Sequence, residues 1–203
     1  MLKKSAEKKH KSFPDSKAIF VTVFLLLLLV SAAGAADIEL GLHYGFRQLK
    51  DANLKNIYGS GTVFRPQVRY FFNRFFALEV SYEGGYKKDG LVGIYNENST
   101  LSMNAVEAAA VLRIEMRGFV PFIKAGLGYY GYKQDIDSPY ARQKVDHHAT
   151  APLVGAGVDA AILPGLSLSA TIHYVPLKVT PFDIEVDLSG LRILFGLRYR
   201  LIL

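Results

Sequence analysis

Apolar and polar residues alternate with a period of two along most of the chain after residue 36. In residues 37–47 the apolar side chains share one parity, while Glu39, His43 and Arg47 share the other parity with two glycines. A β-strand places alternate residues on opposite faces, whereas a helix would scatter these polar residues among apolar ones. The segment therefore predicts a strand with one apolar and one polar face.

The same pattern recurs along the chain and predicts eight strands in all. The other seven cover residues 64–72, 76–83, 106–115, 123–130, 154–160, 167–174 and 191–201. Tight turns are expected at Asn73-Arg74, Arg117-Gly118 and Leu163-Pro164-Gly165, and longer polar connections at about residues 48–61, 86–101, 133–149 and 176–190. Alternation continues through residues 184–188, so we expect the last hairpin to extend above the membrane. Short turns that alternate with long loops are typical of an outer-membrane barrel, with the turns on the periplasmic side.

The polar face of these strands carries charges of both signs together with many glycines. A soluble barrel, for example a periplasmic lipocalin-like one, is the alternative, but it would hide its apolar face inside. A polar, glycine-rich inner face suits the narrow lumen of an eight-stranded membrane barrel, which must close because open edges cannot be tolerated in lipid. We therefore predict an all-β fold, an eight-stranded antiparallel up-and-down transmembrane β-barrel. Its lumen is expected to be plugged by a charge network of Glu39, Arg65, Arg69, Glu79, Glu83, Glu107, Arg113, Lys124, Asp159, His173, Arg192 and Arg198.

The first 36 residues have the features of a cleavable helical signal peptide. A lysine-rich segment precedes the apolar run Ala18–Val30, which is short for a membrane-spanning helix, and small residues follow at 31–36. An uncleaved signal anchor is the alternative. The predicted organisation is a signal peptide at 1–36 and a barrel at 37–203. The leader carries most of the formal charge of +6, so the basic balance gives no reason to expect a nucleic-acid partner.

Aromatic residues gather at the expected periplasmic ends of the strands. The chain has no Trp, so an aromatic girdle must use Tyr and Phe. The residues expected in this girdle are Tyr70, Phe71, Phe72, Phe75, Phe76, Phe119, Phe122 and Tyr199.

Three segments resemble small Gram-negative outer-membrane barrels of the OmpA, OmpX and OmpW group. PFIKAGLGYYGYK (Pro121–Lys133) is similar to a glycine-rich strand of that group, Val154–Lys178 to its next hairpin, and Gly190–Leu203 to its closing strand. The resemblance implies Sec-type export to the outer membrane of a Gram-negative bacterium, with periplasmic chaperones, the barrel-assembly machinery and outer-membrane lipids as partners. It also implies an assembly signal at Gly196, Tyr199, Leu201 and Leu203, where Leu203 replaces the usual terminal Phe.

The resemblance implies a function without catalysis. OmpW-type barrels are associated with passage of small hydrophobic compounds, so a small hydrophobic ligand is one expectation, and a structural or surface-interaction barrel is the alternative. A lipid-modifying enzyme is a third hypothesis, because lipid A deacylases of this shape carry a His-x-Ser motif. Here the matching segment is His173-Tyr174-Val175, which lacks the nucleophile, so we expect no enzyme.

Other polar residues offer no cofactor site. The chain has no Cys, and adjacent His147 and His148 would point apart on an extended chain, which makes a poor metal site. The connection before the last strand holds several apolar residues: Val175, Leu177, Val179, Phe182, Ile184 and Val186. They are expected either to contact lipid or a hydrophobic solute, or to pack within the loops.

Overall fold

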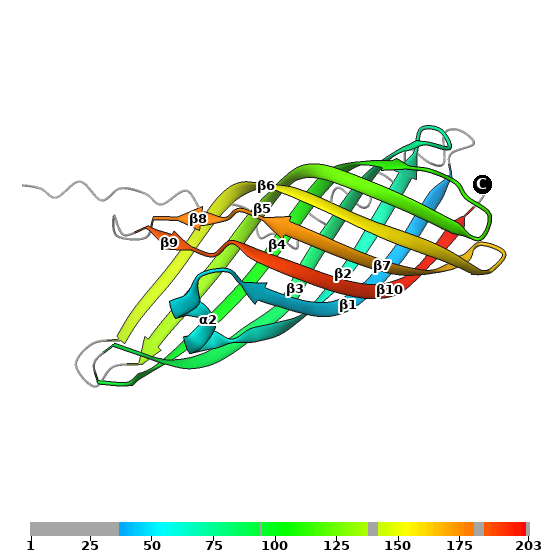
Figure 1. Cartoon of the computed structure of the whole chain (residues 1–203). Helices are drawn as coiled ribbons and strands as arrows, with labels where there is room; N and C mark the ends of the chain where they lie inside the picture. The colour runs from blue at the N-terminus through cyan, green and yellow to red at the C-terminus, as the bar shows by residue number, and fades with distance from the viewer. Residues whose placement is uncertain (1–36, 94, 138–141, 181–184, 202–203) are drawn as a thin grey trace, which may run out of the picture.

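The computed structural model describes residues 37–93, 95–137, 142–180 and 185–201. Eight strands form one closed antiparallel barrel in the order β1-β10-β7-β6-β5-β4-β3-β2 (Figure 1). The strands are β1 (Ile38–Leu49), β2 (Ser60–Phe71), β3 (Phe76–Val92), β4 (Glu97–Arg113), β5 (Phe119–Asp137), β6 (Arg142–Leu163), β7 (Leu166–Val175) and β10 (Gly190–Leu201). The predicted up-and-down barrel is confirmed. The predicted signal peptide and Leu203 lie outside the described residues.

The two faces of each strand separate as the alternation predicts. On β1, Leu42, Tyr44 and Phe46 point outward and are more than half exposed, while His43 and Arg47 are buried inside. An apolar outer face suits the hydrocarbon of a bilayer, and pairing all round the barrel leaves no strand edge open within it. Among the described residues, no helix is both long enough and apolar enough to cross a membrane.

The aromatic girdle is present with two exceptions. Phe72, Phe75, Phe76, Phe119 and Tyr199 are exposed on the outer wall, and Tyr70 is half-buried there. Phe71 and Phe122 were expected in the girdle, but they are buried in the lumen. Each lies on the inward parity of its strand and packs against guanidinium groups, which explains an aromatic ring on a charged face.

Two of the four expected long loops are mostly strand. The expected loops at 86–101 and 133–149 were wrong, because β3 and β4 pair as far as Val92↔Glu97 and β5 and β6 as far as Asp137↔Arg142. The sequence pattern did not reveal these upper strand residues, because the apolar and polar faces exchange sides there. Along β4, residues 106–112 of the outer face are apolar, whereas Ser102 and Asn104 further up are polar and the inward Leu101 and Met103 are apolar.

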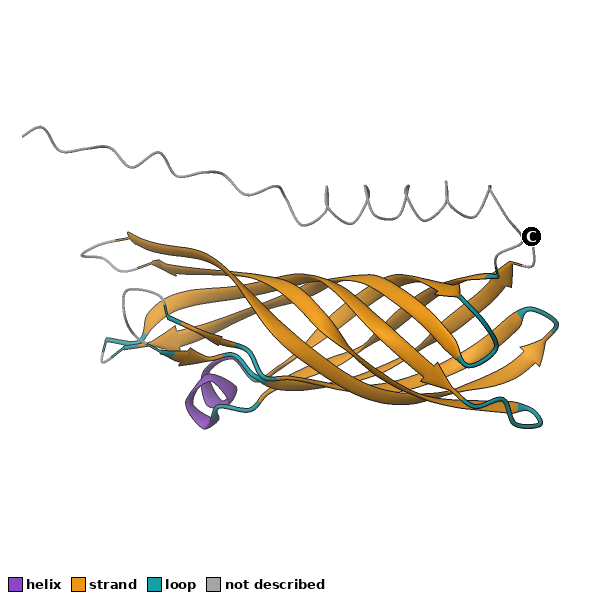
Figure 2. Cartoon of the chain, turned by 90° about the horizontal axis from the view of Figure 1, so that it is seen from above, coloured by secondary structure: helices purple, strands orange, loops and turns teal. Residues whose placement is uncertain are grey.

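The first long connection contains a short helix that the sequence analysis missed, α2 (Ala52–Tyr58). Asp51 caps its first turn, because its carboxylate accepts a hydrogen bond from the Leu54 amide at 2.9 Å. Gly59 follows with a positive φ of 66° and ends the helix, and its N–H donates to the Lys55 carbonyl oxygen at 2.8 Å. The helix lies beside the extended strands at the extracellular end of the barrel (Figure 2).

We call the part above the apolar band the extracellular head; it comprises α2, the upper parts of β3 to β6, and the two-stranded sheet of β8 (Lys178–Val179) and β9 (Val186–Asp187). This small sheet confirms that the last hairpin continues beyond the wall. Val175, Leu177 and Val179 are buried, so among the described rim residues packing within the loops is the correct alternative. Phe182 and Ile184 lie outside the described residues.

The closing seam between β1 and β10 depends on a glycine. A side chain at Gly196 would overlap the carbonyl oxygen of Leu42 and the backbone of His43, which pairs with Gly196 across the seam. We predict that Gly196→Val lowers the free energy of unfolding by about 1–3 kcal/mol, because added volume in a packed site forces the backbone apart.

The measurement is urea unfolding of the refolded barrel, monitored by the heat-dependent shift of its band on SDS gels. Leu197→Val is the matched control, since Leu197 is the next residue and faces outward. Equal unfolding midpoints for Gly196→Val and the control would contradict the prediction.

Candidate functional site

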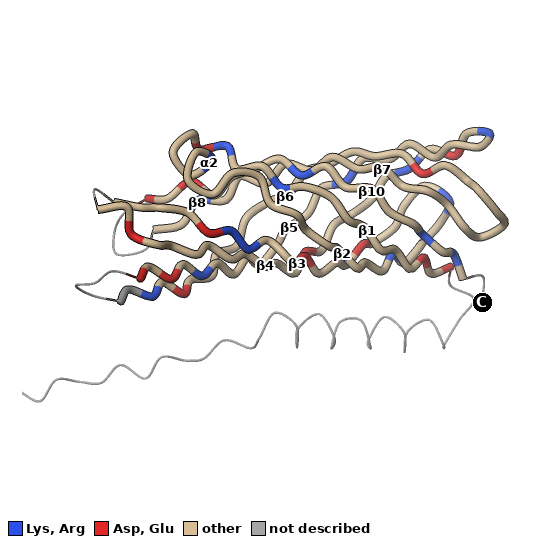
Figure 3. Tube along the Cα trace, turned by 90° about the horizontal axis from the view of Figure 1, so that it is seen from below, with Lys and Arg blue, Asp and Glu red and all other residues tan. Residues whose placement is uncertain are grey.

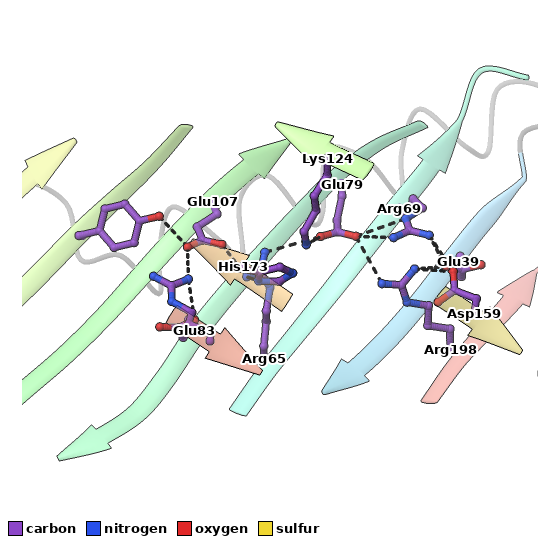
Figure 4. Close-up of polar contacts among 12 residues, drawn as sticks. Glu39, Arg65, Arg69, Glu79, Glu83, Glu107, Lys124, Asp159, His173 and Arg198 are labelled. Atoms are coloured by element: carbon purple, nitrogen blue, oxygen red, sulfur yellow. Dashed lines mark hydrogen bonds and ion pairs between the residues drawn. The ribbon is translucent and has the colours of Figure 1, made fainter. Parts of the chain in front are cut away.

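Charged side chains fill the lumen below the head, and the network they form draws on all eight wall strands. Figure 3 shows acidic and basic residues along the barrel as well as at its ends. The structure joins all of the predicted network residues except Arg113 into one connected set (Figure 4). Each carboxylate of this set has a cationic partner within 4 Å. Buried charges require such pairing, since an unpaired ion loses several kcal/mol of solvation.

The periplasmic half of the network is built around two arginines. Arg69 and Arg198 both contact Asp159, at 3.3 and 2.8 Å, and both contact Glu39, at 3.3 and 3.4 Å. The two guanidinium groups also lie 4.7 and 4.8 Å from the ring centroid of Phe122. The aromatic ring therefore attracts both guanidinium groups by cation–π interaction.

Glu79 connects the two halves of the network. One carboxylate oxygen lies 2.7 Å from Arg69, and the other accepts a short hydrogen bond from Lys124. Arg65 and Arg198 approach the same carboxylate at 3.6 and 3.8 Å. Four cations thus share one fully buried carboxylate.

The half nearer the head is organised by Glu107 and Glu83. Glu107 pairs with Arg65 at 2.7 Å and with Arg192, and it accepts a hydrogen bond from the Tyr130 hydroxyl at 2.7 Å. Arg192 also lies 2.8 Å from Glu83, which in turn pairs with Arg47 at 3.3 Å. The network therefore runs without interruption from Glu39 to Arg47.

The two lumen histidines, His43 and His173, lie on strands that both neighbour β10. Arg65 Nη1 lies 3.0 Å from His173 Nδ1. A guanidinium can only donate, so Nδ1 is the acceptor and the proton of the neutral ring is on Nε2. Among the described residues, no nucleophile is hydrogen-bonded to either histidine. Val175, which stands where the His-x-Ser motif has its serine, is buried.

The network differs from the prediction at two arginines. Arg47 is a member that the predicted set omitted, although its inward parity marked it, and it donates to the Leu188 carbonyl oxygen at 3.2 Å. Arg113 is buried but apart from the network: it pairs with Glu115 at 3.1 Å and stacks on Phe71 near the periplasmic end. Parity could identify both residues as inward, but only the barrel register decides which partners they meet.

An apolar core lies above the charges. Val63, Leu101, Met103, Leu153 and other apolar side chains pack with Tyr86, Tyr130 and Tyr132 across the interior, and Leu177 and Leu188 cover them. Within this head, burial raises the pKa of Tyr132 to about 12, so its hydroxyl stays protonated at physiological pH. The interior is thus filled by ion pairs at the level of the apolar band and by apolar packing above it.

The remaining predicted residues are placed as follows. Gly196, Tyr199 and Leu201 lie on β10, with Tyr199 exposed on the outer wall. In the described part of the chain, no group of three or more His, Asp or Glu side chains has the proximity that a metal site needs.

Glu79 provides the strongest test of the network. We predict that Glu79→Ala lowers the free energy of unfolding by about 3–5 kcal/mol, because it leaves Lys124 and Arg69 with an uncompensated buried charge. Urea unfolding of the refolded protein measures the effect.

Glu185→Ala is the control, since Glu185 forms an exposed pair with Lys178 and removing it is expected to cost less than about 1 kcal/mol. The double variant Glu79→Ala/Lys124→Met should recover part of the loss, because it removes a carboxylate and an ammonium together. Equal costs for Glu79→Ala and Glu185→Ala would rule out a stabilising network.

The fold is shared with known outer-membrane barrels. The outer membrane protein OprG from Pseudomonas aeruginosa is similar to this chain with a TM-score of 0.63 and 12% identity, covering 84% of this chain and 97% of its own. The N-terminal barrel domain of Pseudomonas aeruginosa OprF gives a TM-score of 0.56 and 13% identity, covering 81% and 97%. A major outer membrane protein from Thermus thermophilus gives a TM-score of 0.57 and 10% identity, covering 83% and 100%.

Among curated proteins, no sequence matches the chain. Residues 22–200 match the family described as outer membrane protein beta-barrel domain. This match extends over most of the sequence and agrees with the closed barrel, its apolar outer wall and its charged lumen. The chain therefore belongs to the outer-membrane β-barrel domain family and is a protein of the Gram-negative outer membrane.

Proposed function

We propose that the protein is a non-enzymatic, non-conducting outer-membrane barrel whose extracellular head and outer wall carry its function. The observation that carries this proposal is the filled lumen. Arg69, Glu79 and Arg192 are almost completely buried within the barrel, and Tyr130 joins the charges to the apolar core above. Water-filled passage would require several buried ion pairs to break at once, because these pairs fill the lumen at the level of the apolar band.

The head supports a surface role. Its inner face is apolar and covered, while its outer face is mostly polar and charged, with Leu91 and Tyr95 as exposed apolar exceptions. The hydroxyl of Tyr58 on α2 bonds to Ser99 of β4 and to Gln134 of β5, both at 2.7 Å, which ties the helix to the sheet. A head held in this way is suited to a structural role or to interactions at the cell surface.

Planar-bilayer recording tests the closed lumen. We expect no large, stable water-filled conductance from the wild-type protein, with insertion checked by the heat-modifiable band. The double variant Glu107→Ala/Arg192→Ala removes two opposite charges together and should raise conductance if the network blocks the lumen. Stable wild-type openings on the scale of a porin would refute the proposal.

OmpW-like passage of small hydrophobic compounds is the second candidate, and one observation favours it. The β2–β3 pairing is registered at Phe64↔Gly84 and at Gln67↔Ser81, with no registered pairs between these positions. Pro66 lies in this gap and has no backbone N–H to donate. Buried Val63 and Tyr86 of the apolar core lie next to the gap. A hydrophobic solute would therefore leave the barrel interior laterally, through this part of the wall.

A crosslink across the gap tests this candidate. If solutes leave there, the disulfide variant Pro66→Cys/Tyr82→Cys should abolish uptake of a small hydrophobic dye by cells that express the protein. Leu127→Cys/Pro152→Cys is the matched control, because these outward residues are paired on β5 and β6. Dye uptake that the crosslink at positions 66 and 82 leaves unchanged would exclude passage through the gap. An absence of dye uptake by the protein without the crosslink would exclude it as well.

A further inference from the structure

One edge of the sheet in the head has no neighbouring strand among the described residues. β6 begins at Arg142, but β7 pairs with it only from Val154 downward, so residues 142–153 pair with β5 alone. The opposite edge, on β3, is covered by α2, where Ile57 lies against Gly90. β8 approaches β6 but pairs with β9, and in Figure 1 the first part of β6 projects away from that hairpin. The free edge of β6 therefore offers backbone donors and acceptors to another strand.

Two opposite charges follow each other on the outward face of this edge. The side chains of Lys144 and Asp146 are 63% and 52% exposed, while Val145 between them points inward and is buried. On β5, Asp135 is in register with Lys144 and Lys133 with Asp146, and the ammonium-to-carboxylate distances are 3.8 and 2.9 Å. Each of these rows carries one charge of each sign, and the order of the signs is reversed from one row to the next.

This order of charges makes the edge complementary to itself in one antiparallel register. Residues opposite one another in a sheet share a face, so a two-fold axis that relates two identical strands must pass through a residue. An axis at Lys144 or at Asp146 sets like charges directly opposite, which is destabilising. An axis at His147 leaves Lys144 opposite the uncharged Thr150. An axis at Val145 sets the lysine of each copy opposite the aspartate of the other.

Pairing about Val145 would extend the existing ion pairs of each copy without breaking them. A row across the four strands would read Lys133, Asp146, Lys144 and Asp135, the first two from one copy and the last two from the other, with alternating sign. Charged residues on an edge strand usually prevent contact with other chains. On this edge they oppose the registers centred on Lys144 and on Asp146, and they favour the register centred on Val145.

The geometry of the barrel decides where the second copy must be. The two-fold axis of an antiparallel strand pair is perpendicular to the sheet, and in a barrel wall that direction lies in the plane of the membrane. A half-turn about this axis reverses the direction of the barrel. Two copies in one membrane point the same way, so this pairing joins copies in two facing membranes. The segment lies next to Asp137↔Arg142, the last registered pair of the β5–β6 hairpin, at the end of the head that a facing membrane meets first.

We propose that the free edge of β6 binds the same edge of a second copy in a facing outer membrane, so that the protein holds cells together by homophilic contact. The proposal rests on the surface role proposed above for the head and names its partner. Each copy would contribute residues 142–148 to the joined sheet. A segment this short binds weakly by itself, but many copies on each surface act together and raise the avidity.

Proteoliposomes of two colours, both carrying the refolded protein, test the proposal through the fraction of two-colour particles. We expect the wild-type protein to tether the two populations. Lys144→Glu and Asp146→Lys should each reduce tethering about tenfold when present on both populations, because two opposite-charge pairs become like-charge pairs. Mixing Lys144→Glu vesicles with Asp146→Lys vesicles should restore tethering, since the acidic positions of one copy are then opposite basic positions of the other.

A cysteine at the two-fold axis gives an independent check. The chain has no Cys, and opposed Cα atoms in an antiparallel pair are about 4.5–5.5 Å apart, within the range that a disulfide spans. Val145→Cys should therefore form a disulfide-linked dimer when tethered vesicles are oxidised. Ala149→Cys is the matched control, because Ala149 also faces the core of the head but its two copies would be about 26 Å apart.

Lys87→Glu is the control for charge reversal, because Lys87 is exposed on the outward face of β3, at the opposite side of the same sheet. The heat-modifiable band verifies that each variant folds. Absence of tethering by the wild-type protein, equal losses in Lys144→Glu and Lys87→Glu, or no recovery in the mixture would each overturn the proposal. Planar-bilayer recording does not depend on any of these results, so a failure here is distinguishable from a failure of the closed lumen.

Discussion

Backbone hydrogen bonding in hydrocarbon is the constraint on which the rest of this structure depends. No water is present there to pair with an open strand edge, so the sheet must close on itself. Closure with eight strands leaves a lumen only wide enough for side chains. Polar residues that alternate with the lipid-facing ones must then find partners inside that narrow space. The shared carboxylate of Glu79, with four cations around it, is the direct result.

The same sheet serves two environments. Within the membrane its outer face is apolar and its inner face charged, while in the head the outer face is polar and the inner face apolar. The strands do not change register at this boundary on β4, β5 or β6; only the residue types on each face exchange. On β3 the bulge at Gly85 adds a residue and turns Tyr86 inward, into the core of the head. A membrane barrel thus continues directly into a head that is packed like a soluble domain.

This arrangement directs attention from the lumen to the surfaces of the barrel. The ion pairs and the apolar core fill the interior at successive levels, and α2 is tied to the upper sheet. Among the described residues, the outer face of the head is exposed, and the β2–β3 pairing is interrupted beside Pro66.

The sequence by itself determined the strand count, the tight turns and the inward position of the lumen charges, because these follow from a period of two that each strand carries locally. It did not place Phe71 and Phe122, which were expected on the outer wall and lie in the lumen. It could not show α2, which is only seven residues long, or the upper parts of β3 to β6, where the exchange of faces removes the contrast with the lipid-facing pattern. Only the tertiary structure decided the partners. His173 meets Arg65 across 108 residues of sequence, Arg47 joins the network and Arg113 does not. The physical reason is that the register of eight paired strands, a property of the closed barrel, sets which inward residues share a level of the lumen.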